Sequence, residues 1–148
     1  MVTRTPVQMI EDHAESITSR VVRQIRQDRE LREMARLPES ELRDRAFDVL
    51  RNLGHWLSVT SWDEMARRYE TLGRCRFGEN IPLYEVVRCF CILRENMIDF
   101  VREQGVLDST VQLYAEEELE HRVGRSFDNL VYHVVRGYEE ALRESLSL

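Results

Sequence analysis

Apolar residues recur at three- and four-residue intervals along most of the chain, a spacing that places them on one face of an α-helix. The first such stretch begins at Pro6, since proline suits the first turn of a helix, and covers about residues 6–28. A second stretch covers about residues 39–58. The pattern predicts two amphipathic helices, joined by a connector over residues 29–37 that ends at Pro38.

A capping signal precedes a third apolar stretch. Ser61 is followed three residues later by Glu64, and in this arrangement each side chain accepts a hydrogen bond from the other residue's backbone N–H. The sequence therefore predicts a helix over residues 62–77. Gly78 follows it and is expected to end it, because glycine tolerates the left-handed backbone of a helix stop.

Two more helices are expected in the carboxy-terminal half. Pro82 opens a strongly apolar helix that Gly105 closes. Asp108 or Ser109 can cap a last helix, which is expected to run unbroken over residues 110–144.

The last helix is long for a small domain. Its apolar stripe is expected to face inward from Leu113 to Leu142. At ~1.5 Å per residue it spans roughly 50 Å, so its carboxy-terminal part should project or pair with another helix. The chain shows no alternation long enough to build a sheet. We predict an all-α fold, a single-domain bundle of about five helices over residues 1–148 with a long carboxy-terminal helix.

Composition narrows the classes of partner. The net charge is -6 and no segment has a strong basic excess, which argues against nucleic-acid binding. No apolar run approaches the ~20 residues that cross a bilayer, so no membrane partner is expected. The three cysteines form no CxxC pair and no signal peptide is visible, which favours reduced thiols in the cytoplasm.

Four charged residues fall on apolar helix faces when the helices are projected at ~100° per residue. They are Arg76, Arg94, Glu116 and Glu120. Buried charges must be paired, so three interpretations remain open. The side chains reach solvent at the ends of their stripes; they form one interior Arg-Glu network that fixes helix register; or Arg76 and Arg94 clamp a small anion in a polar pocket.

Metal and cofactor signals are weak. Glu118 and His121 have the spacing of half a di-iron site, but no second Glu-x-x-His exists and both residues point away from the apolar face. No metal and no cofactor are therefore expected. A haem sensor built on a lone histidine, His55 or His133, stays an alternative.

The cysteines allow one redox hypothesis. Cys89 and Cys91 point about 200° apart on a helix, so they cannot hold one metal together. Cys75 lies between Arg74 and Arg76, whose guanidinium groups would favour a thiolate, and is the candidate for a redox-sensing thiol.

A short motif suggests an alternative function. His133-x-x-Arg136-Gly137 resembles the His-x-x-Lys-Gly core of histidine phosphotransfer domains, which are helical bundles with an exposed phosphorylatable histidine. His133 is expected to project away from the apolar stripe, and a cation one turn later can steady a phosphoryl group.

One segment, residues 61–102, carries a pattern of arginines and apolar residues around a turn and a helix start. Its members are Arg67, Arg68, Arg74, Arg76, Gly78, Ile81, Pro82, Leu83, Val86, Arg88, Phe90 and Arg94. This pattern resembles the amino-terminal helical domain of RsbT co-antagonist proteins of the RsbRD type, and helix order agrees more loosely over residues 7–142. Related bundles precede PucR-like transcriptional regulators and some sensor histidine kinases.

This resemblance implies a non-enzymatic bacterial signal-input domain, often a homodimer, that acts on an output domain or signalling protein through its last helix. We expect a signal to shift the packing of the last helix against the two helices before it, with Arg76, Arg94, Glu116 and Glu120 as the two-state contact. A phosphotransfer protein using His133 and a haem or small-ligand sensor are the alternatives.

Overall fold

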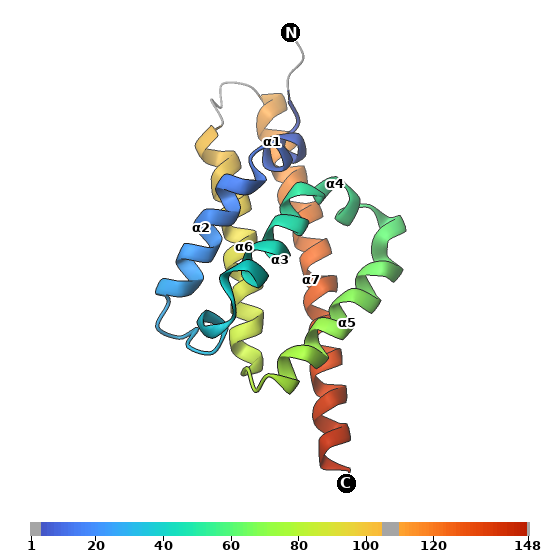
Figure 1. The fold of residues 1–148 in the computed structure, drawn as a ribbon. Coiled ribbons are helices and arrows are strands. Elements are labelled where there is room, and N and C mark those ends of the chain that lie inside the picture. Colours follow the sequence, from blue (N-terminus) through green and yellow to red (C-terminus); the bar gives the residue numbers. More distant parts are fainter. Residues whose placement is uncertain (1–3, 105–109, 148) are drawn as a thin grey trace.

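The chain is an all-α bundle, as predicted (Figure 1). The computed structural model describes residues 4–104 and 110–147, and all regular structure within them is helical. Two short 3-10 helices, η1 and η2, complete the connections. The elements are α1 (Pro6–Asp12), α2 (Ala14–Gln27), η1 (Met34–Arg36), α3 (Glu39–Arg51), α4 (Leu53–Trp56), η2 (Val59–Ser61), α5 (Trp62–Gly78), α6 (Leu83–Gln104) and α7 (Thr110–Leu146). None of these helices is long and apolar enough to cross a membrane.

The first two predicted helices are each divided in the structure. The expected helix over residues 6–28 breaks at His13, and the expected helix over residues 39–58 breaks at Asn52. Both break residues leave the helical region, with φ near -115°. The apolar stripes continue inward across the breaks, so the predicted core faces are right while the predicted continuity is wrong.

Helix α5 begins at Trp62 as predicted, but not through the predicted capping box. The Ser61 hydroxyl instead donates to the Ser58 carbonyl oxygen at 2.8 Å, inside the 3-10 turn η2. Glu64 lies 3.0 Å from His55 Nε2. The capping box of this protein lies at the start of α1, where Thr5 and Gln8 satisfy each other's backbone N–H groups.

The turn between α5 and α6 uses a different residue from the one predicted. Gly78 is the last residue of α5, and Asn80 takes the left-handed conformation with φ 60°. Asparagine tolerates this region better than most residues. The backbone N–H of Ile81 then donates to the Arg76 carbonyl, and the Tyr138 hydroxyl of α7 donates to the Ile81 carbonyl at 2.7 Å.

Replacing Tyr138 by phenylalanine is expected to lower the free energy of unfolding by about 1 kcal/mol, because the hydrogen bond to Ile81 is lost while the ring remains. Urea denaturation measures this difference. The matched control is Tyr84→Phe, since Tyr84 is exposed, and it should change stability by less than about 0.5 kcal/mol. Equal effects of the two substitutions would contradict the role of the Tyr138 hydroxyl.

Two glycines let α5 and α7 touch at their backbones. A Cβ atom placed on Gly73 would lie 2.1 Å from the Val134 carbonyl oxygen, and one placed on Gly137 would lie 2.0 Å from the Glu70 carbonyl oxygen. Neither position accepts a side chain without moving a helix. The contact of α5 with α7 is consequently made backbone to backbone at these two positions.

The last helix has the predicted length, and its carboxy-terminal end extends past the other helices (Figure 1). The inward stripe is shorter than predicted. Leu113 and Leu142, the two ends of the predicted stripe, are exposed. The predicted cap at Asp108 or Ser109, and the stop at Gly105, lie outside the described residues.

Candidate functional site

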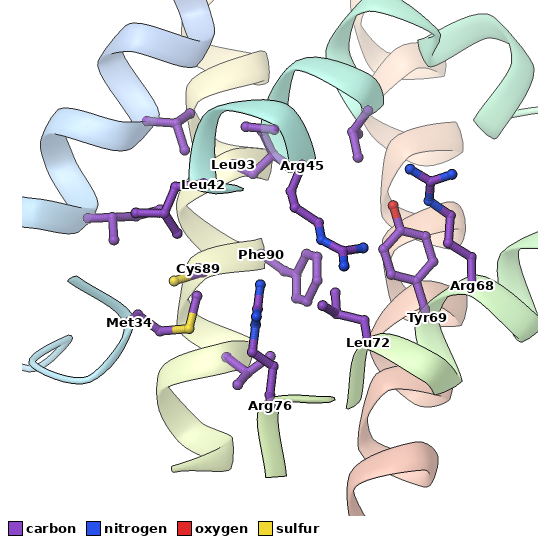
Figure 2. A pocket seen from close by; sticks show the side chains of 15 residues that line it. Met34, Leu42, Arg45, Arg68, Tyr69, Leu72, Arg76, Cys89, Phe90 and Leu93 are labelled. Carbon is purple, nitrogen blue, oxygen red and sulfur yellow. The ribbon is translucent and has the colours of Figure 1, made fainter. Parts of the chain in front are cut away.

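A cavity of about 60 Å³ lies between α2, η1, α3, α5 and α6 (Figure 2). Most of its wall is apolar, since each helix turns its hydrophobic face toward it. The apolar lining residues are Val21, Ile25, Met34, Leu42, Ala46, Val49, Tyr69, Leu72, Val86, Cys89, Phe90 and Leu93. Three arginines, Arg45, Arg68 and Arg76, complete the lining.

Arg76 is the most buried of the three, with only 3% of its side chain exposed. Its Nη1 atom donates to Glu41 Oε1 at 2.9 Å and to Glu79 Oε1 at 2.7 Å. Burial alone would lower the pKa of Arg76, but the hydrogen bonds to Glu79 and Glu41 outweigh it and raise the pKa. The cavity therefore contains a permanently charged guanidinium.

Arg68 and Arg45 approach the cavity from α5 and α3. Arg68 is neutralised by Asp48, at 2.9 Å, and stacks on the Trp56 ring with its Cζ atom 5.3 Å from the centroid. Arg45 has no hydrogen bond or ion pair among the described residues, and Figure 2 shows its guanidinium between Phe90 and Tyr69. One cation at this site is thus left without a counter-charge.

Tyr69 and Cys89 are neutral wall residues at neutral pH. Burial raises the pKa of Tyr69 to about 12. It also raises the pKa of the Cys89 thiol to about 12. Neither group adds a negative charge that would balance Arg45.

The predicted single Arg-Glu network does not form. Arg76 points inward as expected, but its partners are Glu41 and Glu79 rather than Glu116 and Glu120. Sequence separation hid Glu41, because α3 reaches Arg76 only through the tertiary packing of the bundle, whereas Glu79 lies three residues after Arg76.

The other three predicted members lie elsewhere. Arg94 is exposed and its guanidinium lies against Gly124 of α7, so it does not clamp an anion together with Arg76. Glu120 pairs with Arg102. Glu116 is buried and its Oε1 atom has no hydrogen-bond partner.

The redox hypothesis loses its physical basis. Cys75 is exposed, but neither neighbouring arginine faces it. Arg74 is held by Glu140 and Glu144 of α7, and Arg76 turns into the core.

The positions of His55 and His133 do not fit the phosphotransfer and haem alternatives. Only 15% of the His133 side chain is exposed, and its Nδ1 atom lies 3.2 Å from Glu70 Oε1 in the contact with α5. The prediction of an outward, phosphorylatable His133 is therefore wrong. His55 pairs with Glu64 and packs its ring edge-on to Trp56. Neither histidine lines the cavity, and in the described part of the chain no group of three or more His, Cys, Asp or Glu residues is arranged to hold a metal ion.

One further residue of this site could have been predicted by projecting the sequence onto a helix. Arg45 lies on the Leu42, Ala46 and Val49 face of α3, just as Arg76 lies on the apolar face of α5. Charged residues on apolar faces thus marked two of the three cavity arginines, and only Arg76 was predicted.

A protein-family model matches most of the chain. The family model described as the RsbT co-antagonist protein rsbRD N-terminal domain matches residues 15–147. No curated protein and no solved structure matches the chain significantly. The family match covers α2 to α7, and with them every element that lines the cavity.

Proposed function

Because the chain belongs to the family of RsbT co-antagonist protein rsbRD N-terminal domains, a family of regulatory signalling domains, we propose that it is a non-enzymatic bacterial signal-input domain. It acts through protein-protein contacts of α7, first with a second copy of itself and then with an output domain or signalling protein. The observation that carries this proposal is the contact between α5 and α7. Helix α5 lies between the cavity and α7, and the outer face of α7 is exposed.

One face of helix α5 lines the cavity, and another face contacts α7. Tyr69, Leu72 and Arg76 face the cavity. Glu70 and Gly73 face α7, where glycines bring the two backbones into contact. A shift of α5 caused at the cavity must displace α7, because backbone-to-backbone contact leaves no side chains to absorb the movement.

The outer face of α7 supports self-association. Four apolar residues lie on it at positions of a coiled-coil seam, spaced three, seven and four residues apart. They are Tyr132, Val135, Leu142 and Leu146, and we call this set the outer stripe. Tyr132 is 58% exposed and Leu146 is 75% exposed. Isolated apolar residues are common on surfaces, but four of them along one face of a projecting helix favour a partner helix.

Charge on the same face also favours a second copy. Glu139 lies within the outer stripe between Val135 and Leu142, Arg143 lies beside the stripe, and both line the same shallow groove as Tyr132 and Val135. Neither has an ion-pair partner among the described residues. In a two-fold pair each copy offers both charges, so one copy's glutamate can meet the other's arginine.

Equilibrium sedimentation of the full chain tests the proposed function. We expect the wild type to be a dimer and Leu142→Glu to weaken dimerisation at least about tenfold, because a charge enters the apolar stripe. The control is Val59→Glu, an exposed apolar residue of η2, which should leave the dimer unchanged. A monomeric wild type, or equal effects of both substitutions, would contradict the proposal.

A further inference from the structure

Exposed large apolar side chains are concentrated on two helices of the bundle, α6 and α7. Tyr84 lies on α6, and the others of these two helices lie on α7 between Val111 and Leu146. Among the described residues, only Phe47 and Val59 are comparably exposed on other elements. Single exposed apolar residues are ordinary, but a concentration of them on neighbouring helices marks an interaction surface.

Helices α6 and α7 pack against each other and run in opposite directions (Figure 1). Two contacts fix how they are aligned. Just before α6 begins, the Ile81 carbonyl accepts a hydrogen bond from the Tyr138 hydroxyl. In the middle of α6, Arg94 lies against Gly124. Residue numbers therefore rise along α6 as they fall along α7, and a residue between these contacts can be matched with its neighbour on the other helix.

Four apolar residues lie between the two contacts, and we call them the two-helix patch. Tyr84 and Val87 are three residues apart on one side of α6, and Val131 and Val135 are four residues apart on one side of α7. The alignment of the helices places Val87 level with Val131 and Tyr84 level with Val135. Tyr84 is 66% exposed and the three valines are half-buried. The patch is therefore an apolar surface shared by both helices.

Charges of both signs lie at one end of the two-helix patch. Arg94 follows it on α6 and Asp128 precedes it on α7, and both side chains are exposed. Neither has an ion-pair partner among the described residues. In a two-fold pair the same surface is present on both sides, so the arginine of one copy can meet the aspartate of the other. This surface is consequently complementary to a second copy of itself.

We infer that a second copy of the chain packs on α6 as well as on α7, so that two helices from each copy form the interface, with the two-helix patch at its centre. This inference rests on the proposed function and extends the contact from the outer stripe to α6. The patch and the outer stripe share Val135, so the two form one continuous surface. The second helix adds buried area toward the roughly 800 Å² per partner that stable interfaces bury.

Equilibrium sedimentation of the full chain carrying Tyr84→Glu tests the inference. We expect dimerisation to weaken at least about tenfold, because a carboxylate enters the centre of the interface. Tyr84 is exposed in the first turn of α6, where a negative charge suits the helix, so circular dichroism should show an unchanged fold. Tyr84→Phe keeps the ring and should dimerise as the wild type does. Val59→Glu places the same charge outside α6 and α7 and should also leave the dimer unchanged.

The results separate this inference from the proposed function. A wild-type dimer that Leu142→Glu weakens and Tyr84→Glu does not would overturn the inference and leave the proposed function standing. Equal weakening by Tyr84→Glu and Val59→Glu would overturn it as well. Weakening by Tyr84→Glu with no effect of Leu142→Glu would support the inference and contradict the role of the outer stripe. A wild type that sediments as a monomer contradicts both.

Discussion

Gly137→Val should destabilise the bundle by about 3 kcal/mol or more, the largest effect expected of a single substitution here. The new Cβ would lie 2.0 Å from the Glu70 carbonyl oxygen and 2.7 Å from its carbon, and both belong to the backbone of α5. Side chains can rotate away from a clash, but a helix backbone can only shift as a whole. The branched valine side chain adds two more methyl groups at the same place.

Urea denaturation monitored by circular dichroism measures this loss. The matched control is Gly78→Ala, because a Cβ atom on Gly78 meets nothing within 4 Å. Gly78 is the last residue of α5, so alanine there should be neutral or should stabilise by up to about 1 kcal/mol. If Gly137→Val were as stable as the wild type, α5 and α7 would not be in backbone contact.

The second large effect is a loss of stability at alkaline pH. Burial raises the pKa of Cys89 from 9.0 to about 12. It raises the pKa of Tyr69 from 10.0 to about 12. In the unfolded chain both groups lose their protons at the lower, ordinary pKa. Above about pH 9 the unfolded state therefore binds fewer protons than the folded state, and stability falls with rising pH until about pH 12.

The composition of the chain makes this transition easy to assign. All 21 basic residues are arginine, whose side chains keep their charge over this range, so no lysine titrates with the cysteines and tyrosines. Each raised pKa unit is worth about 1.4 kcal/mol, and the two groups together should cost on the order of 5 kcal/mol between pH 9 and 12. Below about pH 8 their contribution is constant, because both groups are then protonated in the folded and the unfolded chain.

Urea denaturation at half-unit steps from pH 8 to 11.5 measures this dependence. The double variant Cys89→Ala with Tyr69→Phe should lose most of the slope, because neither side chain can ionise. Cys91→Ala is the control, since Cys91 is exposed, and it should keep the slope of the wild type. An unchanged slope in the double variant would show that other groups cause the alkaline loss.

Local pattern predicted where the helices lie because their apolar periodicity is strong. It did not predict the breaks, because these depend on distant partners. The clearest example is Gly54, at the start of α4, whose N–H donates to Glu11 Oε2 of α1 at 2.9 Å. Glu11 thereby satisfies the backbone of a helix that begins more than forty residues later, and no local motif records such a cap.

For the candidate site, the sequence predicted that the Arg76 side chain points inward, but it did not predict the residues with which Arg76 pairs. Projection placed Arg76 in the interior correctly. Its partner Glu41 comes from α3, and only the packing of the bundle brings the two together, while its partner Glu79 lies three residues further along the chain. Glu85 was missed in the same way. It is buried on α6, where its Oε1 atom accepts hydrogen bonds from the backbone N–H groups of Glu33 and Met34.

The central claim of this account is that a change at the cavity reaches α7 through α5. Ala46 lines the cavity from α3, and Ala46→Val adds two methyl groups at the cavity wall. Two-dimensional NMR of backbone amides, comparing this variant with the wild type, measures the transmission. The account predicts shifted amide resonances at Val134 and Gly137, where α7 meets α5. Shifts confined to the helices that line the cavity, with those of α7 unchanged, would contradict it.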